Sequence, residues 1–514
     1  MDRKWWTLGA VCTGVFMLLL DITIVNVALP DIQRAFAASL TDLQWVISAY
    51  ALTLAAFLLT AGSLADRFGR RRLFAIGLVA FTAGSLACGL ATGPLFLVLA
   101  RAAQGVGGAV MFATSLALLA DAFRGRERGV AFGVFGAVTG VAVAVGPVLG
   151  GAITSGLSWR WIFFVNLPIG ALALAVTLLR VGESRDPDAG RLDLAGFATF
   201  SLGLAGLVFG LIRSTSDGWG SASVLAPLAA SAVLLVAFGV VERRQRRPML
   251  DLGLLRVPTF NGGLAAAWAI SASLFSLLTY LIIYVQNILG LSAVGAGVRF
   301  LPLTGALFLT AGVAGRLTSH VPRRLLIGPG FALIGVGLLL MRGLTVSSVW
   351  THLLAGMVIS GVGAGLVNVP LVSTAVGVVE PARAGMASGI NSTARQIGVA
   401  TGVAGLGTIF AGHVRSVVTS QLSSTALAGH AAGVAHAIST GGAAEAIAAV
   451  PGPLRATVAL AARSAFVSGL NLILLVGAIV AFAAVAVTLV LVRERDFVAT
   501  AHYDAEPIAA MARS

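Results

Sequence analysis

Residues 62–72 read Gly-Ser-Leu-Ala-Asp-Arg-Phe-Gly-Arg-Arg-Arg, and this charged run separates two long apolar stretches. Charged side chains are costly in the hydrocarbon of a bilayer, so the run cannot lie inside it. Each flanking stretch has about 20 mostly apolar residues, the length that a helix needs to cross a bilayer. The pattern therefore predicts two transmembrane helices joined by a tight loop at the membrane surface.

The composition of the whole chain also indicates a membrane protein. Hydrophobic residues make up 58% of the 514 residues and charged residues 11%, whereas about a quarter of a soluble domain is charged. The net charge of +14 does not predict nucleic-acid binding, because the arginines form short clusters between apolar stretches. Cys12 and Cys88 lie within apolar stretches and predict no disulfide framework. We expect no metal and no cofactor.

The apolar stretches predict an all-α integral membrane protein with about fourteen transmembrane helices. Their ranges are roughly 6–29, 43–64, 73–92, 94–120, 129–153, 161–181, 193–213, 222–241, 261–289, 294–315, 323–342, 348–372, 385–411 and 466–492. An even number of spans puts both termini on one side. With that side in the cytoplasm, inner loops hold about three times as many basic residues as outer loops, which fixes this orientation in the cell membrane.

A weak internal repeat suggests how the chain is divided. Residues 315–324 align without a gap to 62–71. The two segments are identical at four positions, which are one glycine, one leucine and two arginines. The alternative is that 315–324 is a basic loop that matches by chance. Two parallel halves facing each other are typical of transporters. We expect a six-helix bundle at 1–182, two inserted helices with linkers at 183–255, a second six-helix bundle at 256–495 and a cytoplasmic tail at 496–514. Residues 412–465, rich in Ala, Gly, Ser and His, predict a large extracellular loop whose alanine-rich stretches can form short surface helices.

The loop at 62–72 resembles the loop between the second and third helices of the major facilitator superfamily. The matching residues are Gly62, Leu64, Asp66, Arg67, Gly69, Arg70 and Arg71. The resemblance covers the chain except 412–465 and the tails, and it implies transport by alternating access. It also implies a cytoplasmic gate, for which we expect Gly62, Asp66, Arg67, Gly69 and Arg70, with Asp121 and Arg124 as participants. The alternative for Asp66 is static anchoring of the topology.

Asp21 is a carboxylate within the first predicted span, in the run Leu-Asp-Ile-Thr-Ile-Val-Asn-Val-Ala-Leu-Pro at 20–30. At this depth a charge costs about 3 kcal/mol or more, so it should face a cavity or a partner. Arg101 opens the run Arg-Ala-Ala-Gln-Gly-Val-Gly-Gly-Ala, and at about 1.5 Å per residue the two side chains lie at similar depths. We expect Asp21 to carry protons, with Arg101 as its partner and with Asn26 and Gln104 as further residues for proton coupling or substrate binding. The alternatives for Asp21 are a permanent ion pair or a protonated hydrogen-bond donor, and the alternative for Arg101 is that it binds only backbone carbonyls and Gln104.

Three further runs make the resemblance more specific. Residues 20–30 and 159–170 resemble the first and sixth helices of the fourteen-span drug:proton antiporters, which implies that Asp21 handles protons. The fifth span resembles a motif that marks exporters in the superfamily, although Ala142 stands where a glycine is usual. Its residues are Gly140, Gly146, Pro147, Gly150 and Gly151. Small residues and proline physically predict close helix packing, and only the resemblance links them to export.

The second half offers polar residues but no clear carboxylate within its spans. The polar residues are Gln286, Asn287, Asn368, Asn391, Arg395 and Gln396. Arg395 lies near midspan and should face a cavity or a partner, whereas the amides fit a cavity or hydrogen bonds between helices. The balance of charges favours neutral, zwitterionic or weakly anionic hydrophobic substrates over dications.

These features predict a proton-coupled exporter of hydrophobic small molecules, such as drugs or antibiotics, that works as a monomer. No phosphate-binding loop of the Gly-x-x-x-x-Gly-Lys-Ser/Thr type occurs, so ATP-driven transport by this chain is not expected. No enzyme motif occurs, and we expect a transporter whose partners are its substrate, protons and membrane lipids. The alternatives are an exporter of lipid or cell-envelope precursors and a non-transporting sensor or scaffold.

Overall fold

The computed structural model describes residues 2–123, 125–185, 193–245, 250, 252–318, 320–379 and 384–497. In this part of the chain the regular structure is helical, with no strand. The first group of helices is α1 (Arg3–Phe36), α2 (Leu40–Phe68), α3 (Arg70–Gly89), α4 (Pro94–Ala122), α5 (Gly125–Gly156), α6 (Trp161–Phe164) and α7 (Asn166–Arg180). We call α1–α7 the first group.

Two helices follow, and then a second group. The two are α8 (Leu194–Asp217) and α9 (Ala222–Arg244). The second group starts with a nearly continuous helical path of η1 (Leu254–Arg256), α10 (Pro258–Ile270), η2 (Ser271–Phe275), α11 (Ser276–Ile283) and η3 (Tyr284–Ile288). It continues with α12 (Ala293–Leu317), α13 (Arg324–Leu340), α14 (Thr351–Gly377), α15 (Ala384–Leu422), η5 (Ala428–His430), α16 (Ala431–Ser439), α17 (Ala443–Ala449), α18 (Gly452–Leu491) and η6 (Glu494–Asp496).

The helices are long and apolar enough for a multi-pass membrane protein. Within the described residues, twelve helical segments meet the length and hydropathy needed to cross a bilayer, and a thirteenth is added if the bent pair Val134–Ala142 and Val145–Gly156 is one span. Arg324–Leu340 is a shorter apolar helix at the position of another predicted span. The all-α membrane fold is therefore confirmed, whereas a count of fourteen spans is not.

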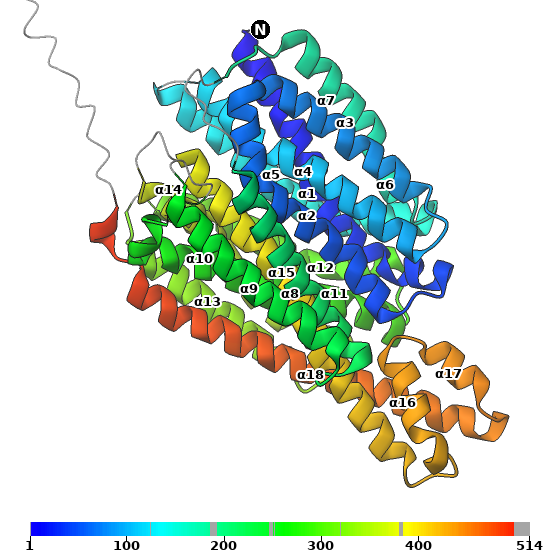
Figure 1. Cartoon of the computed structure of the whole chain (residues 1–514). Helices are drawn as coiled ribbons and strands as arrows, with labels where there is room; N and C mark the ends of the chain where they lie inside the picture. The colour runs from blue at the N-terminus through cyan, green and yellow to red at the C-terminus, as the bar shows by residue number, and fades with distance from the viewer. Residues whose placement is uncertain are drawn as a thin grey trace, which may run out of the picture.

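The helices lie side by side, and the two ends of the bundle differ (Figure 1). The N-terminus and η6 lie at one end, which we call the terminal end, and α16 and α17 project from the opposite end. Helices α8 and α9 pack on each other, and α8 also packs on α2 of the first group and α15 of the second.

The tight turn between α2 and α3 has a geometry that requires glycine. Gly69 has φ of +107°, and a Cβ atom there would lie 2.7 Å from the Glu183 carboxylate. That carboxylate accepts hydrogen bonds from the backbone N–H groups of Arg71 and Arg72 at 3.0 and 3.2 Å. Glu183 thus caps the free N–H groups at the start of α3, where negative charge is favourable.

Residues 412–465 are more helical than a large loop. Helix α15 continues to Leu422 and α18 already begins at Gly452, so both extend well past the predicted ends of their spans. Between them lie η5, α16 and α17, in the alanine-rich stretches. Alanine is the strongest helix former, which explains why helix continues there. The predicted span at 161–181 is also divided, into α6 and α7.

Candidate functional site

Asp21 lies at the centre of a sealed polar cluster inside the first group. Its side chain is 0% exposed. One carboxylate oxygen accepts from Arg101 Nη1 at 2.5 Å, and the other accepts from Gln104 Nε2 at 2.9 Å and from Asn166 Nδ2 at 3.1 Å. All three nitrogens can only donate, so this geometry fits the ionised carboxylate.

Arg101 is 2% exposed and has partners besides Asp21. Its Nη1 also donates to Gln104 Oε1 at 2.6 Å, and its Nε donates to the Val46 carbonyl at 3.3 Å. The guanidinium carbon lies 4.2 Å from the ring centroid of Tyr50, a distance at which a cation–π contact is favourable. Arg101 is therefore paired with Asp21, and it also bonds a backbone carbonyl and Gln104 instead of binding those two alone.

Asn166 belongs to this cluster and was not among the predicted site residues. It is the first residue of α7, and its Nδ2 donates to Ser85 Oγ at 2.9 Å as well as to Asp21. Its Oδ1 is buried and has no hydrogen-bond partner. Asn166 lies in the run at 159–170 that resembles the sixth helix of drug antiporters, which was the one signal in the sequence for it.

Asn26 lies apart from the Asp21 cluster. Its Nδ2 donates to the Ile22 carbonyl at 3.3 Å, and its Oδ1 accepts from Thr279 Oγ1 on α11 at 3.3 Å. Asn26 therefore links α1 to the second group. Of the two amides expected beside Asp21, Gln104 contacts the carboxylate and Asn26 does not.

The residues predicted for a gate lie together at the terminal end. Asp66 accepts from Arg70 Nε at 3.0 Å and Nη2 at 2.9 Å, and Arg70 Nη1 lies 3.9 Å from Asp121. Arg67 is exposed, and its guanidinium lies against the Phe68 ring. A Cβ atom at Gly62 would meet nothing within 4 Å, so no packing contact in this conformation requires glycine there. Arg124 lies outside the described residues.

The fifth-helix motif is the place where α5 touches both α1 and α12. Cβ atoms at Gly146 and Gly150 would lie 1.9 Å from Thr23 and 2.8 Å from Ile24 of α1. A Cβ atom at Gly151 would lie 2.5 Å from the Ala293 carbonyl of α12. The motif also includes Pro147, whose carbonyl faces Gly297 of α12, and Gly140, which faces Phe308. These small residues let three helices approach closely.

Hydrogen bonds join the two groups near the α16–α17 end. Val294 N donates to Ser155 Oγ at 3.2 Å, and Gln286 Nε2 donates to the Val27 carbonyl at 2.8 Å. Further out, Leu40 N donates to the Thr440 carbonyl at 2.6 Å. At the terminal end, ion pairs form within one group, such as Lys4–Glu127 in the first and Arg323–Glu494 in the second. In this conformation, hydrogen bonds therefore hold the first and second groups together at the α16–α17 end.

The other polar residues of the second group have different surroundings. Asn287 is exposed next to the buried Gln286, and Gln396 is half-buried on α15. Arg395 Nη2 donates to Asn368 Oδ1, and Asn391 is 3% exposed. Among the described residues, no group of three or more His, Cys, Asp or Glu is arranged to hold a metal ion.

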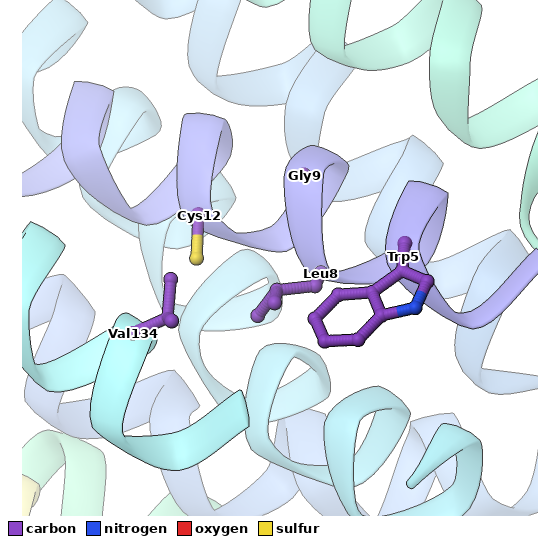
Figure 2. Close-up of a pocket in the computed structure, with 5 residues that line it drawn as sticks. All are labelled: Trp5, Leu8, Gly9, Cys12 and Val134. Carbon is purple, nitrogen blue, oxygen red and sulfur yellow. The ribbon is translucent and has the colours of Figure 1, made fainter. Parts of the chain in front are cut away.

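An apolar hollow of about 430 Å³ lies between α1 and α5. Trp5, Leu8, Gly9, Cys12 and Val134 line it, and Figure 2 shows the side chains of Trp5, Leu8, Cys12 and Val134 gathered around it. A Cβ atom at Gly9 would meet nothing within 4 Å. The hollow can therefore accept an apolar group without displacing a polar one.

Comparisons with known proteins give consistent results along the chain. The family model described as Major Facilitator Superfamily matches residues 11–403. The chain is 38% identical to the multidrug resistance protein Stp of Mycobacterium tuberculosis over 417 residues, which are 81% of this chain and 78% of that protein. It is 34% identical to the tetracenomycin C resistance and export protein of Streptomyces glaucescens over 505 residues, covering 95% of this chain and 91% of the relative.

A solved structure shares the fold. It is a bacterial homologue of the human lysosomal transporter Spinster, with a TM-score of 0.63 over 98% of this chain and 100% of that one. Its sequence identity is 17%, so the likeness concerns the arrangement of helices alone.

Proposed function

The chain belongs to the major facilitator superfamily, and from this premise we propose that it exports hydrophobic small molecules across the cell membrane in exchange for protons. The family consists of transporters, so the chain moves its substrate and does not transform it. The two relatives described above are named for multidrug resistance and for resistance to and export of tetracenomycin C. Their names support drugs or antibiotics as the substrate class.

The observation that carries the proton-coupled mechanism is the sealed Asp21 cluster. A carboxylate buried this deeply in a membrane protein is expensive and is retained where it has a function. Arg101 can release Asp21 without losing all of its partners, because Val46, Gln104 and the Tyr50 ring remain beside it. The pair can therefore separate when a proton or a substrate competes for one of its members.

Asn166 fits the protonated state of the same cluster. Its unpartnered Oδ1 is an acceptor within an amide that already contacts Asp21. Rotation of that amide presents Oδ1 to a protonated Asp21, which then donates its O–H. One amide thus serves both states of the carboxyl group, as a donor to the anion and as an acceptor from the acid.

The conformation fits one step of alternating access. With the terminal end in the cytoplasm, as the basic loops favour, the bonds at the α16–α17 end close the outer side. Asp21 then lies in its ionised geometry in an inward-facing protein, after proton release and before substrate binding. Opening outward requires the bonds between Ser155 and Val294 and between Leu40 and Thr440 to break.

The hollow between α1 and α5 supports an apolar substrate. It lies near the start of α1, so it is on the cytoplasmic side in this orientation. Its lining offers apolar side chains and no charge, which suits transient binding of a hydrophobic molecule before it reaches Asp21.

A cellular assay with a matched pair of variants tests this function. The chain is expressed in bacteria that lack their own drug pumps, and accumulation of ethidium and tetracenomycin C is measured. Asp21→Asn should abolish efflux at unchanged membrane abundance, and Asn166→Leu should reduce it severely. The control Asp31→Asn removes a carboxylate on the same helix, outside the cluster, and should leave efflux intact. Full efflux by Asp21→Asn would contradict the proposed mechanism.

A further inference from the structure

A second charged cluster lies between two helices of the second group, apart from Asp21. Arg395 of α15 donates through Nη2 to Asn368 Oδ1 of α14 at 2.5 Å, and Asn368 Nδ2 donates to the Ala364 carbonyl at 2.9 Å. Helix α15 begins at Ala384 at the terminal end. At about 1.5 Å per residue, Arg395 therefore lies roughly 16 Å into the bundle.

The charge of Arg395 is not balanced by the protein around it. Arg101 has the Asp21 carboxylate at 2.5 Å, whereas among the described residues the one hydrogen-bond partner of the Arg395 guanidinium is the neutral Asn368. Arg395 Nε is buried and has no hydrogen-bond partner. A guanidinium cannot lose its proton to relieve the cost of a buried, unpaired charge. An acceptor that is not part of the protein can satisfy both the unpartnered N–H group and the positive charge.

The Arg395 cluster is partly exposed as well as positively charged. Arg395 and Asn368 are both partly exposed, unlike Asp21 and Arg101. A charged side chain at this depth faces a water-filled cavity or another helix and not lipid. The exposed part of the Arg395 side chain is therefore within reach of a ligand that contacts Asn368.

Asn391 adds a second donor that has no partner. It lies four residues before Arg395, on the same face of α15. Its side chain is 3% exposed, and its Nδ2 has no hydrogen-bond partner. A buried amide N–H without an acceptor destabilises the protein, and an anion beside Arg395 would relieve this cost as well.

We propose that Arg395, Asn391 and Asn368 form a subsite that binds the anionic group of a hydrophobic weak acid, such as an aromatic carboxylate or phenolate. This inference rests on the proposed export function and names the substrate class. The guanidinium fork matches a carboxylate in shape and charge, and Asn391 Nδ2 supplies a further donor. Since the Asp21–Arg101 pair is neutral, Arg395 gives the interior of the protein an uncompensated positive charge that attracts acids and disfavours dications.

Equilibrium binding to the purified full-length chain tests the subsite. The probes are fluorescent 9-anthracenecarboxylate and its neutral methyl ester, which differ in charge but share the apolar ring. Wild type should bind the carboxylate more tightly than the ester. Arg395→Gln, which can still bond Asn368, should weaken carboxylate binding at least about tenfold and change ester binding by less than about twofold.

Three further variants make the result specific. Arg395→Lys keeps the charge but loses the fork, so its carboxylate affinity should lie between wild type and Arg395→Gln. Asn391→Asp places an internal anion beside Arg395 and should also weaken carboxylate binding. Arg299→Gln is the matched control, because Arg299 is another arginine of the second group with a buried, unpartnered Nε. It should bind both probes as wild type does.

The inference is overturned if wild type shows no preference for the carboxylate, if Arg395→Gln weakens both probes equally, or if Arg299→Gln has the same effect. Its failure is distinguishable from failure of the export function. If ethidium efflux depends on Asp21 but carboxylate binding does not depend on Arg395, only the subsite is wrong. If carboxylate binding depends on Arg395 while Asp21→Asn pumps normally, only the proton-coupled mechanism is wrong.

Discussion

Arg101 Nη1 lies 2.5 Å from an Asp21 carboxylate oxygen, and neither side chain is more than 2% exposed. The two residues come from α1 and α4, 80 positions apart in the sequence. The pair places opposite charges in a part of the protein that neither water nor lipid reaches in this conformation. Such a pair adds little net stability, because desolvation of the two ions offsets their attraction. A role in transport therefore explains the pair better than a contribution to stability does.

Removal of one charge should be much more costly than removal of both. Arg101→Gln leaves the Asp21 carboxylate buried without its cation and should lower the free energy of unfolding by about 3–5 kcal/mol. The double variant Asp21→Asn with Arg101→Gln has no buried charge and should recover most of this loss. Thermal unfolding of the purified variants measures the effect. Equal instability of the single and double variants would contradict a charge-driven cost.

Neither of these variants should transport. The double variant is the informative one, because its stability is restored while the proton carrier is absent. Efflux by the double variant would show that the pair is structural.

The contact between Ser155 and Val294 should open in each transport cycle. Cysteines at these two positions, in a chain whose Cys12 and Cys88 are replaced by alanine, should form a disulfide in the inward-facing state because Ser155 Oγ lies 3.2 Å from Val294 N. Oxidation should stop efflux and reduction should restore it. The two single-cysteine variants should be insensitive to oxidation. Undiminished efflux by the fully cross-linked protein would contradict opening at this end.

Asp66 provides a test of the gate. In this conformation it makes a partly exposed ion pair with Arg70, so Asp66→Asn should lower stability by less than about 1 kcal/mol. We expect transport to fall at least tenfold nevertheless, because the resemblance implies that Asp66 acts in the cytoplasmic gate. Unfolding and efflux are measured on the same preparations. Efflux by Asp66→Asn at the wild-type rate would instead favour static anchoring of the topology by Asp66.

The apolar hollow can be filled without disturbing the fold. Gly9→Phe adds a ring where a Cβ atom meets nothing within 4 Å, so stability should be unchanged while binding of bulky apolar substrates weakens severalfold. Gly239→Phe on α9 is the matched control, since its Cβ atom also meets nothing within 4 Å. Fluorescence titration with ethidium measures both. Equal binding by the two variants would exclude the hollow from the substrate path.

The sequence was sufficient to predict the membrane class, the positions of most helices and the partnership of Asp21 with Arg101. That partnership was predicted from the similar depths of the two charges, together with the neighbouring first and fourth helices that the resemblance implies. Asn26 does not contact Asp21, because five residues along a helix turn the side chain by about 140°, and it bonds Thr279 of α11 instead.

Other residues depend on tertiary structure that no local pattern reveals. Asn166 reaches Asp21 because the break between α6 and α7 places it there. Glu183 caps α3 from a segment more than 110 residues away. The extensions of α15 and α18 were missed because their composition is not that of a transmembrane span, although alanine-rich sequence favours helix outside the bilayer as well.

Substrate-evoked proton movement in proteoliposomes is the direct test of proton-coupled export through Asp21. Wild type and Asp21→Asn are reconstituted with a pH-sensitive dye inside the vesicles, and ethidium, 9-anthracenecarboxylate and its methyl ester are added in turn. We predict proton flux by wild type on addition of at least one compound, and no flux by the equally well-folded Asp21→Asn protein. Flux that persists in Asp21→Asn, or no flux with any compound from folded wild type, would contradict proton-coupled export through Asp21.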